Sequence, residues 1–308
     1  MSSSTLQDAP PPGANHPGRG APPPSGRGGS ARRAAGARRG WSAVRKTVAV
    51  LIGLAVVFPF YWTFVISVSK PGGFYRFPPQ LLPQWDWSNW SRAWDEAPWI
   101  RFFVNTLFIA SATVLLCLVT SVLAGYAFGV LRFRGRKFLT LLVLSVLMMP
   151  GTVLIIPDYV LATDIHWVNT YWIQIVPWGA SVFGIFLVRQ FFVTMPQEIL
   201  DAASVDGAGR LRVLWHIGVP AVRPALALIA INVFMASWNS FLWPEIMTNS
   251  TNVQPVEVGL SAFSNDVGTD IPGLAAAATF TTLPLIVFFL LLQRHFIRGA
   301  LSAAGSVK

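Results

Sequence analysis

Residues 194–224 read TMPQEILDAASVDGAGRLRVLWHIGVPAVRP, and they lie between two apolar runs that are each long enough to cross a bilayer. Thr194 and Gln197 have the spacing of a capping box, which predicts that a helix begins here. The residues at 206–209 are expected to break this helix, and a second short helix is expected to follow, which Pro220 and Pro224 end. The stretch therefore predicts a helical hairpin at the membrane surface, with a tight turn that another protein could approach closely.

The composition is that of an integral membrane protein. Hydrophobic residues make up 53% of the chain, charged residues make up only 12%, and the mean hydropathy is +0.53. Soluble domains carry about 25% charged residues. The formal net charge of +10 does not indicate nucleic-acid binding, because the basic residues follow the membrane topology described below. The single cysteine, Cys117, lies in an apolar run and is expected to be a small buried side chain without a disulfide partner.

Two regions are expected in the chain. Residues 1–44 are rich in Pro, Gly, Ser, Ala and Arg and have too few aliphatic side chains for a core. They are therefore predicted to form a disordered, basic cytoplasmic tail, whose arginines could touch anionic membrane lipid. Residues 45–308 are predicted to form the membrane domain, which includes the hairpin at 194–224.

The apolar runs predict an all-α integral membrane protein with six transmembrane helices. Prolines inside the first, third and fourth runs are expected to kink them. In the second run, Gly125 and Gly129 form a GxxxG-like pattern that indicates close helix packing. A Trp-rich outer loop at 69–101 is expected to hold one short helix, and a short outer loop is expected at 158–166. The predicted transmembrane helices cover residues 48–68, 102–131, 138–157, 167–188, 224–243 and 273–292.

The distribution of Lys and Arg predicts the orientation in the membrane. With the N-terminus inside, only four of the 23 basic residues fall in outer loops, namely Lys70, Arg76, Arg92 and Arg101. Basic residues concentrate in the cytoplasmic segments of membrane proteins. Both termini and the hairpin are therefore predicted to be cytoplasmic.

Catalytic and metal-binding signatures are missing from the sequence. No G-x-x-x-x-G-K-[ST] occurs, so the chain has no phosphate-binding loop of that type and is not expected to be an ATPase. The four His residues are spread over different segments, and neither a metal site nor a Ser-His-Asp grouping is predicted. The apolar runs hold no central Lys, Arg, Asp or Glu, which argues against ion-coupled transport and for energy supplied from outside the chain.

The hairpin resembles the "EAA" loop of the membrane subunits of binding-protein-dependent ABC importers. The residues in question are, in chain order, Asp201, Ala202, Ala203, Asp206, Gly207, Ile217 and Pro220. In that family the loop forms a coupling helix that docks on an ATPase subunit, so the resemblance implies the same contact here. The leading acid is Asp201 where the family has Glu, which keeps the charge and loses one methylene. The topology independently places this loop in the cytoplasm, where such an ATPase would lie.

The C-terminal end is similar to the carbohydrate branch of that family, and more narrowly to the six-span partner in maltose-type importers. The similar segments are Ala276–Thr279, Leu283–Leu285, Gln293–Gly299 and Gly305–Lys308. The resemblance implies a type I ABC importer permease fold in the bacterial cell membrane and a carbohydrate as substrate. It also implies a second homologous permease subunit, a dimer of ATP-binding cassette ATPases that binds the ATP, and an extracellular or periplasmic solute-binding protein. No catalytic residue, metal or cofactor is expected in this chain.

Four polar or aromatic residues are candidates for the substrate pathway: Asn105, Asn232, Trp238 and Asn239. Amides suit the hydroxyl groups of a sugar, and aromatic faces suit its C–H face. For each of the four taken singly, hydrogen bonding between helices or packing at the membrane interface is the favoured interpretation. Two further functions stay open from the sequence: a self-contained secondary transporter or channel, and an ABC importer for a non-sugar solute. The chain shows no internal inverted repeat that would favour the first of these.

Overall fold

The computed structural model describes residues 28–70, 77–78, 81–265 and 268–305. Residues up to Phe58 form one compact unit, and Pro59–Lys308 form the other. Helix α1, Gly28–Ser67, begins in the first unit and continues into the second. It starts inside the segment for which we predict disorder, since the Ala- and Arg-rich sequence after Gly28 consists largely of good helix formers. Residues 1–27 of that predicted tail lie outside the described residues.

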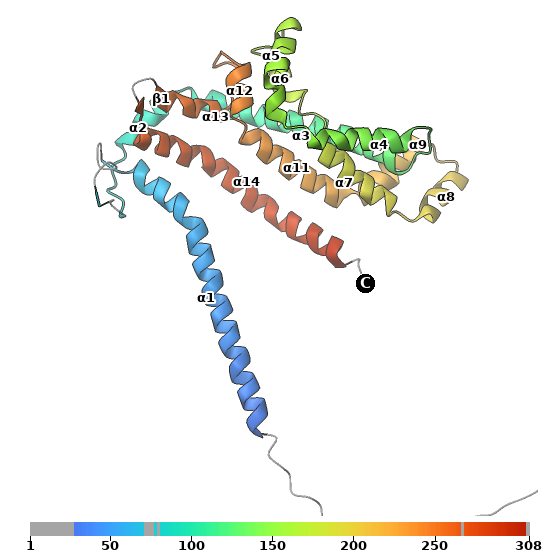
Figure 1. Cartoon of the computed structure of the whole chain (residues 1–308), viewed down its shortest axis with the longest axis horizontal. Helices are drawn as coiled ribbons and strands as arrows, with labels where there is room; N and C mark the ends of the chain where they lie inside the picture. The colour runs from blue at the N-terminus through green and yellow to red at the C-terminus, as the bar shows by residue number, and fades with distance from the viewer. Residues whose placement is uncertain (1–27, 71–76, 79–80, 266–267, 306–308) are drawn as a thin grey trace, which may run out of the picture. The chain divides into compact units, whose positions relative to one another are not determined.

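Four apolar helices form the central bundle of the second unit (Figure 1). Helix α3, Trp99–Gly129, packs against α7, Val182–Val193, and against α11, Arg223–Trp238. Helix α11 also packs against α14, Ile271–Gly305. Helices α3, α11 and α14 correspond to the second, fifth and sixth predicted spans, although α11 ends earlier than its apolar run. The fold is therefore helical, as predicted.

The buried side chains of this bundle form two main clusters. An aromatic cluster joins Trp99 of α3, Phe234 of α11 and Phe280 of α14. A second cluster joins α3, α7 and the hairpin, and it includes Val188 and Cys117, both of which have no exposed surface. The prediction that Cys117 is a buried free thiol is confirmed. Large apolar side chains on the outward faces of the helices are exposed, as expected for surfaces that face lipid.

Glycines in α3 allow α7 to approach closely. A Cβ atom built at Gly125 would lie 2.6 Å from Cγ1 of Val188, and one at Gly129 would lie 2.7 Å from Cβ of Phe192. Non-bonded carbon atoms prefer about 3.5–4.0 Å, so any side chain at either position would push the two helices apart. The prediction that this GxxxG-like pair serves helix packing is confirmed.

The third predicted span is not one continuous helix. Helix α4, Arg136–Ser145, ends before Pro150, and the helical segment Gly151–Asp164 then continues at an angle of 87°. Proline lacks an N–H and pushes the preceding residue to extended geometry, and Met149 is indeed extended, with φ −86° and ψ 121°. The predicted outer loop at 158–166 is also wrong, because most of it is helical in α5, Ile155–Asp164.

The fourth predicted span is also divided. Helix α6, Tyr171–Ile175, is separated from α7 by a turn that contains Pro177 and Gly179. The short helix expected in the Trp-rich loop is confirmed as α2, Ser88–Asp95. The remaining elements are η1 (Val146–Met148), η2 (Gly151–Leu154), α8 (Gln197–Val205), α9 (Arg210–Val213), η3 (Leu214–Gly218), α10 (Val219–Ala221), α12 (Leu242–Met247), α13 (Val256–Gly259), η4 (Leu260–Phe263), β1 (Ser264–Asn265) and β2 (Gly268–Thr269), of which the two strands pair antiparallel.

Within the described residues, three helical segments are long and apolar enough to cross a membrane. They are Arg45–Ser67, Trp99–Gly129 and Ile271–Leu290. Two further spans are possible if two consecutive helical segments that meet at a sharp bend together cross the membrane, which raises the number to five. The two pairs of segments are Arg136–Met148 with Gly151–Asp164, and Arg210–Ala221 with α11. Helix α7 is apolar but short. The structure therefore shows several candidate spans, and two of the predicted six are divided near the prolines that we expected to kink them.

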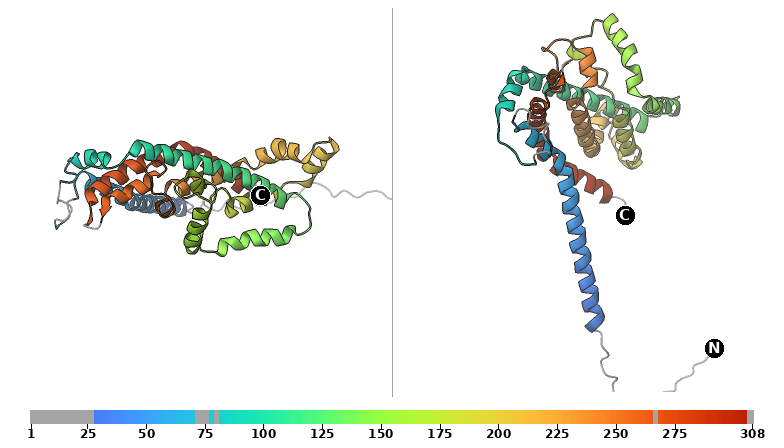
Figure 2. Two further views of the ribbon diagram at one scale, coloured as in Figure 1. Left: turned by 90° about the horizontal axis from the view of Figure 1, so that it is seen from above. Right: turned by 60° about the vertical axis from the view of Figure 1, so that its left-hand side comes forward.

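The hairpin of α8 and α9 lies at the end of the bundle opposite α2 and β1 (Figures 1 and 2). At the α2 end, Nη2 of Arg92 forms an ion pair of 3.1 Å with Asp270. The hairpin and the loops around α2 are thus separated by the length of α3. For a chain that spans a membrane, this arrangement places them on opposite sides.

Candidate functional site

The polar hairpin consists of α8 and a second, longer helical segment from Arg210 to Ala221. The predicted capping box is wrong, because the Thr194 hydroxyl donates to the carbonyl oxygens of Gln190 (3.2 Å) and Phe191 (3.0 Å) and so closes α7. The second helix of the hairpin continues through Pro220 and ends at Ala221, between the two prolines that were expected to end it. Pro220 follows the π-helical turn η3, where the regular hydrogen-bond ladder is already interrupted, so its missing N–H costs little.

The turn of the hairpin is a Schellman motif centred on Gly207. The N–H of Gly207 donates to the Ser204 carbonyl (3.1 Å), and the N–H of Ala208 donates to the Ala203 carbonyl (2.9 Å). Gly207 has φ +71°, a left-handed conformation that glycine adopts without strain. A Cβ at this position would meet no atom within 4 Å. We expected a side chain here to clash, and within this chain it does not; only a bound partner could supply that clash.

The second helix of the hairpin is anchored to the bundle. Val213 and Leu214 are buried, and Leu214 belongs to the cluster that contains Phe192 of α7. The Tyr126 hydroxyl of α3 donates to the Arg210 carbonyl at 3.3 Å. These contacts fix the hairpin to α3 and α7, so a force on the hairpin reaches both helices.

The opposite side of the hairpin is exposed and largely apolar. The exposed fractions are 88% for Val205, 67% for Leu211 and 54% for Trp215. Asp201 and Asp206 are exposed beside them. We expected Asp201 to pair with a basic residue or to cap a backbone group, but among the described residues it makes neither contact. Of the other predicted coupling residues, Ala202 and Gly207 are exposed, Ile217 and Pro220 are half-buried, and Ala203 is buried.

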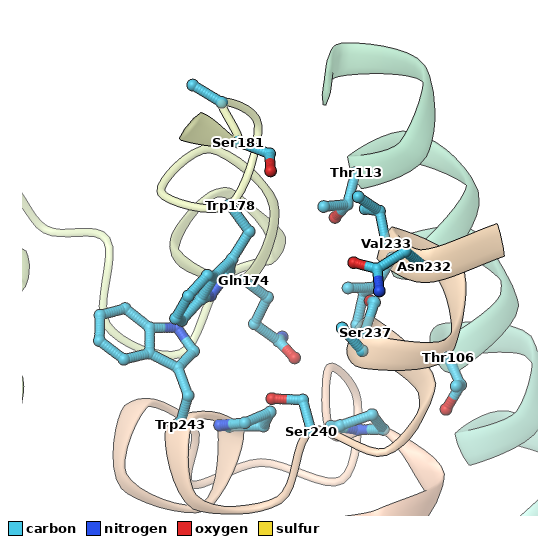
Figure 3. Close-up of a pocket in the computed structure, with 15 residues that line it drawn as sticks. Thr106, Thr113, Gln174, Trp178, Ser181, Asn232, Val233, Ser237, Ser240 and Trp243 are labelled. Atoms are coloured by element: carbon cyan, nitrogen blue, oxygen red, sulfur yellow. The ribbon is translucent and has the colours of Figure 1, made fainter. Parts of the chain in front are cut away.

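A cavity of about 340 Å³ lies between α3, the segment that joins α6 to α7, and α11 (Figure 3). Thr106, Ile109 and Thr113 line it from α3. Asn232, Val233 and Ser237 line it from α11. Figure 3 shows the Gln174 side chain pointing into the space between Trp178 and Asn232. The remaining lining residues are Ala180, Ser181, Ala236, Ser240, Trp243, Pro244 and Pro255.

The structure brings one of the four predicted pathway residues to this cavity, namely Asn232. Asn105 is buried, and its amide nitrogen donates to the carbonyl oxygens of Asn252 (3.1 Å) and Gln254 (2.8 Å), so it ties a loop to α3. Trp238 packs in the aromatic cluster.

The Asn239 amide donates to the Met235 carbonyl at 2.8 Å and caps α11. Asn105, Trp238 and Asn239 therefore do not line the cavity together with Asn232. Thr113 and Gln174, which do line the cavity, were not singled out from the sequence. A lone Thr or Gln in an apolar run is the only signal that either gives.

The described residues hold no group of three or more His, Cys, Asp or Glu side chains that could bind a metal ion. Among the described residues, no charged side chain lines the cavity. The arrangement is thus a neutral cavity inside the bundle and, at one end of the bundle, a hairpin that exposes both charged and apolar side chains.

Comparisons with known proteins agree with this arrangement. A family described as "Binding-protein-dependent transport system inner membrane component" matches residues 121–301. An arabinooligosaccharides transport system permease protein of Halalkalibacterium halodurans is 35% identical over 207 residues, which are 67% of this chain and 74% of that protein. An sn-glycerol-3-phosphate transport system permease protein of Yersinia pestis is 31% identical over 262 residues, which are 82% of this chain and 93% of that protein.

A solved structure has a similar fold. It is a chain of a bacterial ABC transporter involved in the import of the acidic polysaccharide alginate, with a TM-score of 0.74 and 21% sequence identity over 84% of this chain and 98% of that chain. The family match covers the hairpin, the cavity wall formed by α11 and most of α14. The chain therefore belongs to the family of binding-protein-dependent transport system inner membrane components, and it is a membrane-embedded permease subunit of an ABC importer.

Proposed function

We propose that this chain forms half of the translocation pathway of an ATP-driven carbohydrate importer and that a separate ATPase docks on its hairpin. The exposed face of the hairpin is the observation that carries the proposal. The hairpin exposes the apolar side chains of Val205, Leu211 and Trp215, and its Asp201 has no ion-pair partner among the described residues. Exposed apolar side chains are costly to leave in water and suit a protein partner. The predicted coupling residues, Asp201, Ala202, Ala203, Asp206, Gly207, Ile217 and Pro220, belong to this hairpin.

The topology that we propose has six crossings with both termini in the cytoplasm. The divided segment of α6 and α7 supplies the crossing that no single long helix provides. The exposed Arg210 and Arg212 then lie on the same side as the basic loop that contains Arg134 and Arg136, as the preference for basic residues at the cytoplasmic face requires.

The partners follow from this function. We propose a second, homologous permease subunit, a dimer of ATP-binding cassette ATPases that holds the ATP, and an external solute-binding protein. The relatives include a permease for arabinooligosaccharides and one for sn-glycerol 3-phosphate, so an importer for a non-sugar solute is the alternative to be tested. A self-contained transporter is disfavoured because no charged side chain lines the cavity.

The test is co-purification of the tagged full chain with its partner permease and ATPase, with Gly207→Trp beside the wild type. A Cβ at Gly207 meets no atom within 4 Å, so the variant should fold and keep the partner permease, although its left-handed turn is strained. We expect it to lose most of the ATPase, since the ring occupies the space that the ATPase needs.

Gly135→Trp is the matched control. Gly135 also has a positive φ, of +85°, and a Cβ there meets no atom within 4 Å, but it lies in the loop before α4 and outside the hairpin. This variant should retain the ATPase. Equal retention of the ATPase by both Trp variants and the wild type would show that the hairpin is not the docking element.

A further inference from the structure

The cavity has buried polar atoms that the protein itself does not satisfy. Among the described residues, Oγ1 of Thr113 and Oε1 of Gln174 are fully buried and have no hydrogen-bond partner. The side chains are 1% and 3% exposed respectively, and both line the cavity. Buried polar atoms in folded proteins nearly always have a partner, so these two atoms are expected to bond to a molecule in the cavity, either water or a ligand that displaces it.

The orientation of the Gln174 amide is fixed by the protein. Its nitrogen, Nε2, donates to the Val253 carbonyl at 2.9 Å and is 3.4 Å from the Thr170 carbonyl. Both partners are acceptors, so the nitrogen must face them and the oxygen must face the cavity (Figure 3). A carbonyl oxygen can only accept a hydrogen bond. The ligand at this position must therefore donate one, as a hydroxyl group does and an ionised phosphate or carboxylate does not.

The rest of the lining is also suited to a neutral ligand. Within the part of the chain that the structure describes, no Lys, Arg, His, Asp or Glu side chain lines the cavity, so an anion that entered it would lose its hydration without gaining an opposite charge. Hydroxyl and amide groups of Ser181, Asn232, Ser237 and Ser240 lie around the wall. The volume of about 340 Å³ is at the lower end of the range for small-molecule sites, which is about 300–1,000 Å³.

Two tryptophans provide an apolar surface on one side of the cavity. The rings of Trp178 and Trp243 meet edge to face, with centroids 5.4 Å apart. Nε1 of Trp243 donates to the Ile173 carbonyl at 2.9 Å, which fixes the orientation of that ring. Aromatic faces beside hydroxyl and amide groups are complementary to a sugar ring, which has an apolar C–H face and a polar rim.

We propose that this cavity binds a neutral sugar unit through hydrogen bonds to Gln174 and Thr113, and that it excludes phosphorylated or acidic sugars. The inference rests on the proposed import function, and it specifies the substrate class. It distinguishes this chain from two proteins that it resembles, a permease for sn-glycerol 3-phosphate and a transporter for the acidic polysaccharide alginate. Thr113 and Gln174 are then residues that bind and select the substrate.

The test measures ligand binding to the purified full chain in lipid nanodiscs by saturation-transfer NMR titration. The probes are arabinotriose as the neutral ligand, and sn-glycerol 3-phosphate and an alginate trisaccharide as the anionic ligands. We expect saturable binding of arabinotriose, and at least tenfold weaker binding of both anions. Binding of either anion as tight as that of arabinotriose, or no binding of arabinotriose, would overturn the inference.

Thr113→Val is the decisive variant. Because its hydroxyl has no partner in the protein, the isosteric change removes no internal hydrogen bond and should not lower the melting temperature. The affinity for arabinotriose should fall about fivefold to tenfold, which is the usual contribution of one hydrogen bond between neutral groups. An unchanged affinity in a folded Thr113→Val protein would refute the assigned contact.

Thr279→Val is the control, because its hydroxyl donates to Ala275 of its own helix at 2.7 Å and lies outside the cavity. Its affinity for arabinotriose should equal that of the wild type. Failure of the binding test is separable from failure of the proposed function, since ATPase co-purification through the hairpin needs no sugar.

Discussion

Replacement of Gly125 by Ala is expected to force α3 and α7 apart. A Cβ at this position lies 2.6 Å from Cγ1 and 2.8 Å from Cβ of Val188, and 3.1 Å from the backbone nitrogen of Arg189. Val188 has no exposed surface, so its side chain has nowhere to move. The clash must therefore be relieved by a shift of one helix, which would also disturb the cavity wall that α3 provides.

Two effects of opposite sign determine the magnitude. Alanine is better than glycine in a helix interior by about 1 kcal/mol, whereas overpacking of a filled core typically costs about 1–3 kcal/mol. Gly53→Ala in α1 isolates the first effect, because a Cβ at Gly53 meets no atom within 4 Å. The difference in unfolding free energy between the two variants should therefore be about 1–3 kcal/mol, and each kcal/mol corresponds to roughly 2–4 °C in melting temperature for a folded unit of this size.

The assay is thermal unfolding of the detergent-solubilised full chain, arranged as a double-mutant cycle with Val188→Ala. Val188→Ala alone should destabilise the protein, because it opens a cavity in the core. In the double variant the new methyl group of residue 125 occupies part of the vacated space, so the loss should be about 0.5–3 kcal/mol smaller than the sum of the two single losses. Strict additivity, or a Gly125→Ala protein as stable as Gly53→Ala, would refute the α3–α7 contact.

Two further predictions concern the hairpin turn and a buried carboxyl group. Gly207→Ala should cost about 1–2 kcal/mol by thermal unfolding, because residue 207 has φ +71°, whereas Gly209→Ala should cost little at φ −67°; equal losses would contradict the left-handed turn. Burial raises the pKa of Glu257 above its ordinary value of 4.5. The stability linked to this raised pKa is fully present below the pKa of the unfolded chain and is lost as the pH rises through the folded-state pKa. Glu257→Gln should therefore raise the melting temperature at pH 7 but not below pH 4.5, and an equal effect at both pH values would count against this reading.

The long helices could be predicted from the sequence because they depend on local signals. A run of apolar residues with no charge, such as 102–131, leaves the backbone no alternative to a helix in lipid. The GxxxG-like pair was also predictable, since glycines four residues apart on one helix face remove side chains from the same stripe. Both signals lie within one element and need no knowledge of its neighbours.

The divided spans could not be predicted from hydropathy alone. The run at 138–157 is apolar throughout, yet Pro150 separates two helical segments that meet at 87°. Proline in an apolar run can either kink a helix or end it, and packing of neighbouring elements decides which occurs. The prediction of a capping box at Thr194 was wrong for a related reason. A Thr hydroxyl between two helices can bond to the end of the first helix or to the start of the second, and the Thr194 hydroxyl bonds back to α7.

The cavity residues were the least predictable. Asn105 and Gln174 are both amides near the ends of apolar runs, and nothing local distinguishes them. In the structure Asn105 has its amide nitrogen and its amide oxygen both bonded, the latter to the Tyr171 hydroxyl at 2.8 Å, whereas Gln174 keeps its oxygen free. The difference arises from which loop each amide meets, a long-range contact that the sequence does not encode locally.

The hairpin and the cavity are connected through a bend in the chain. Leu214 and Phe192 join the hairpin to α7, and Gly125 locks α7 against α3, so these parts are expected to move together. Helix α11 leaves the hairpin at an angle of 74° next to Val222. Gln174 and Asn232 both line the cavity, but Gln174 precedes α7 in the chain whereas Asn232 lies on α11, beyond the bend. At 1.5 Å per residue, Asn232 is about 14 Å along α11 from Arg223. A change of angle at the bend would therefore alter the distance between Gln174 and Asn232. We therefore expect docking on the hairpin to change the shape of the cavity, although no charged side chain among the described residues lines that cavity.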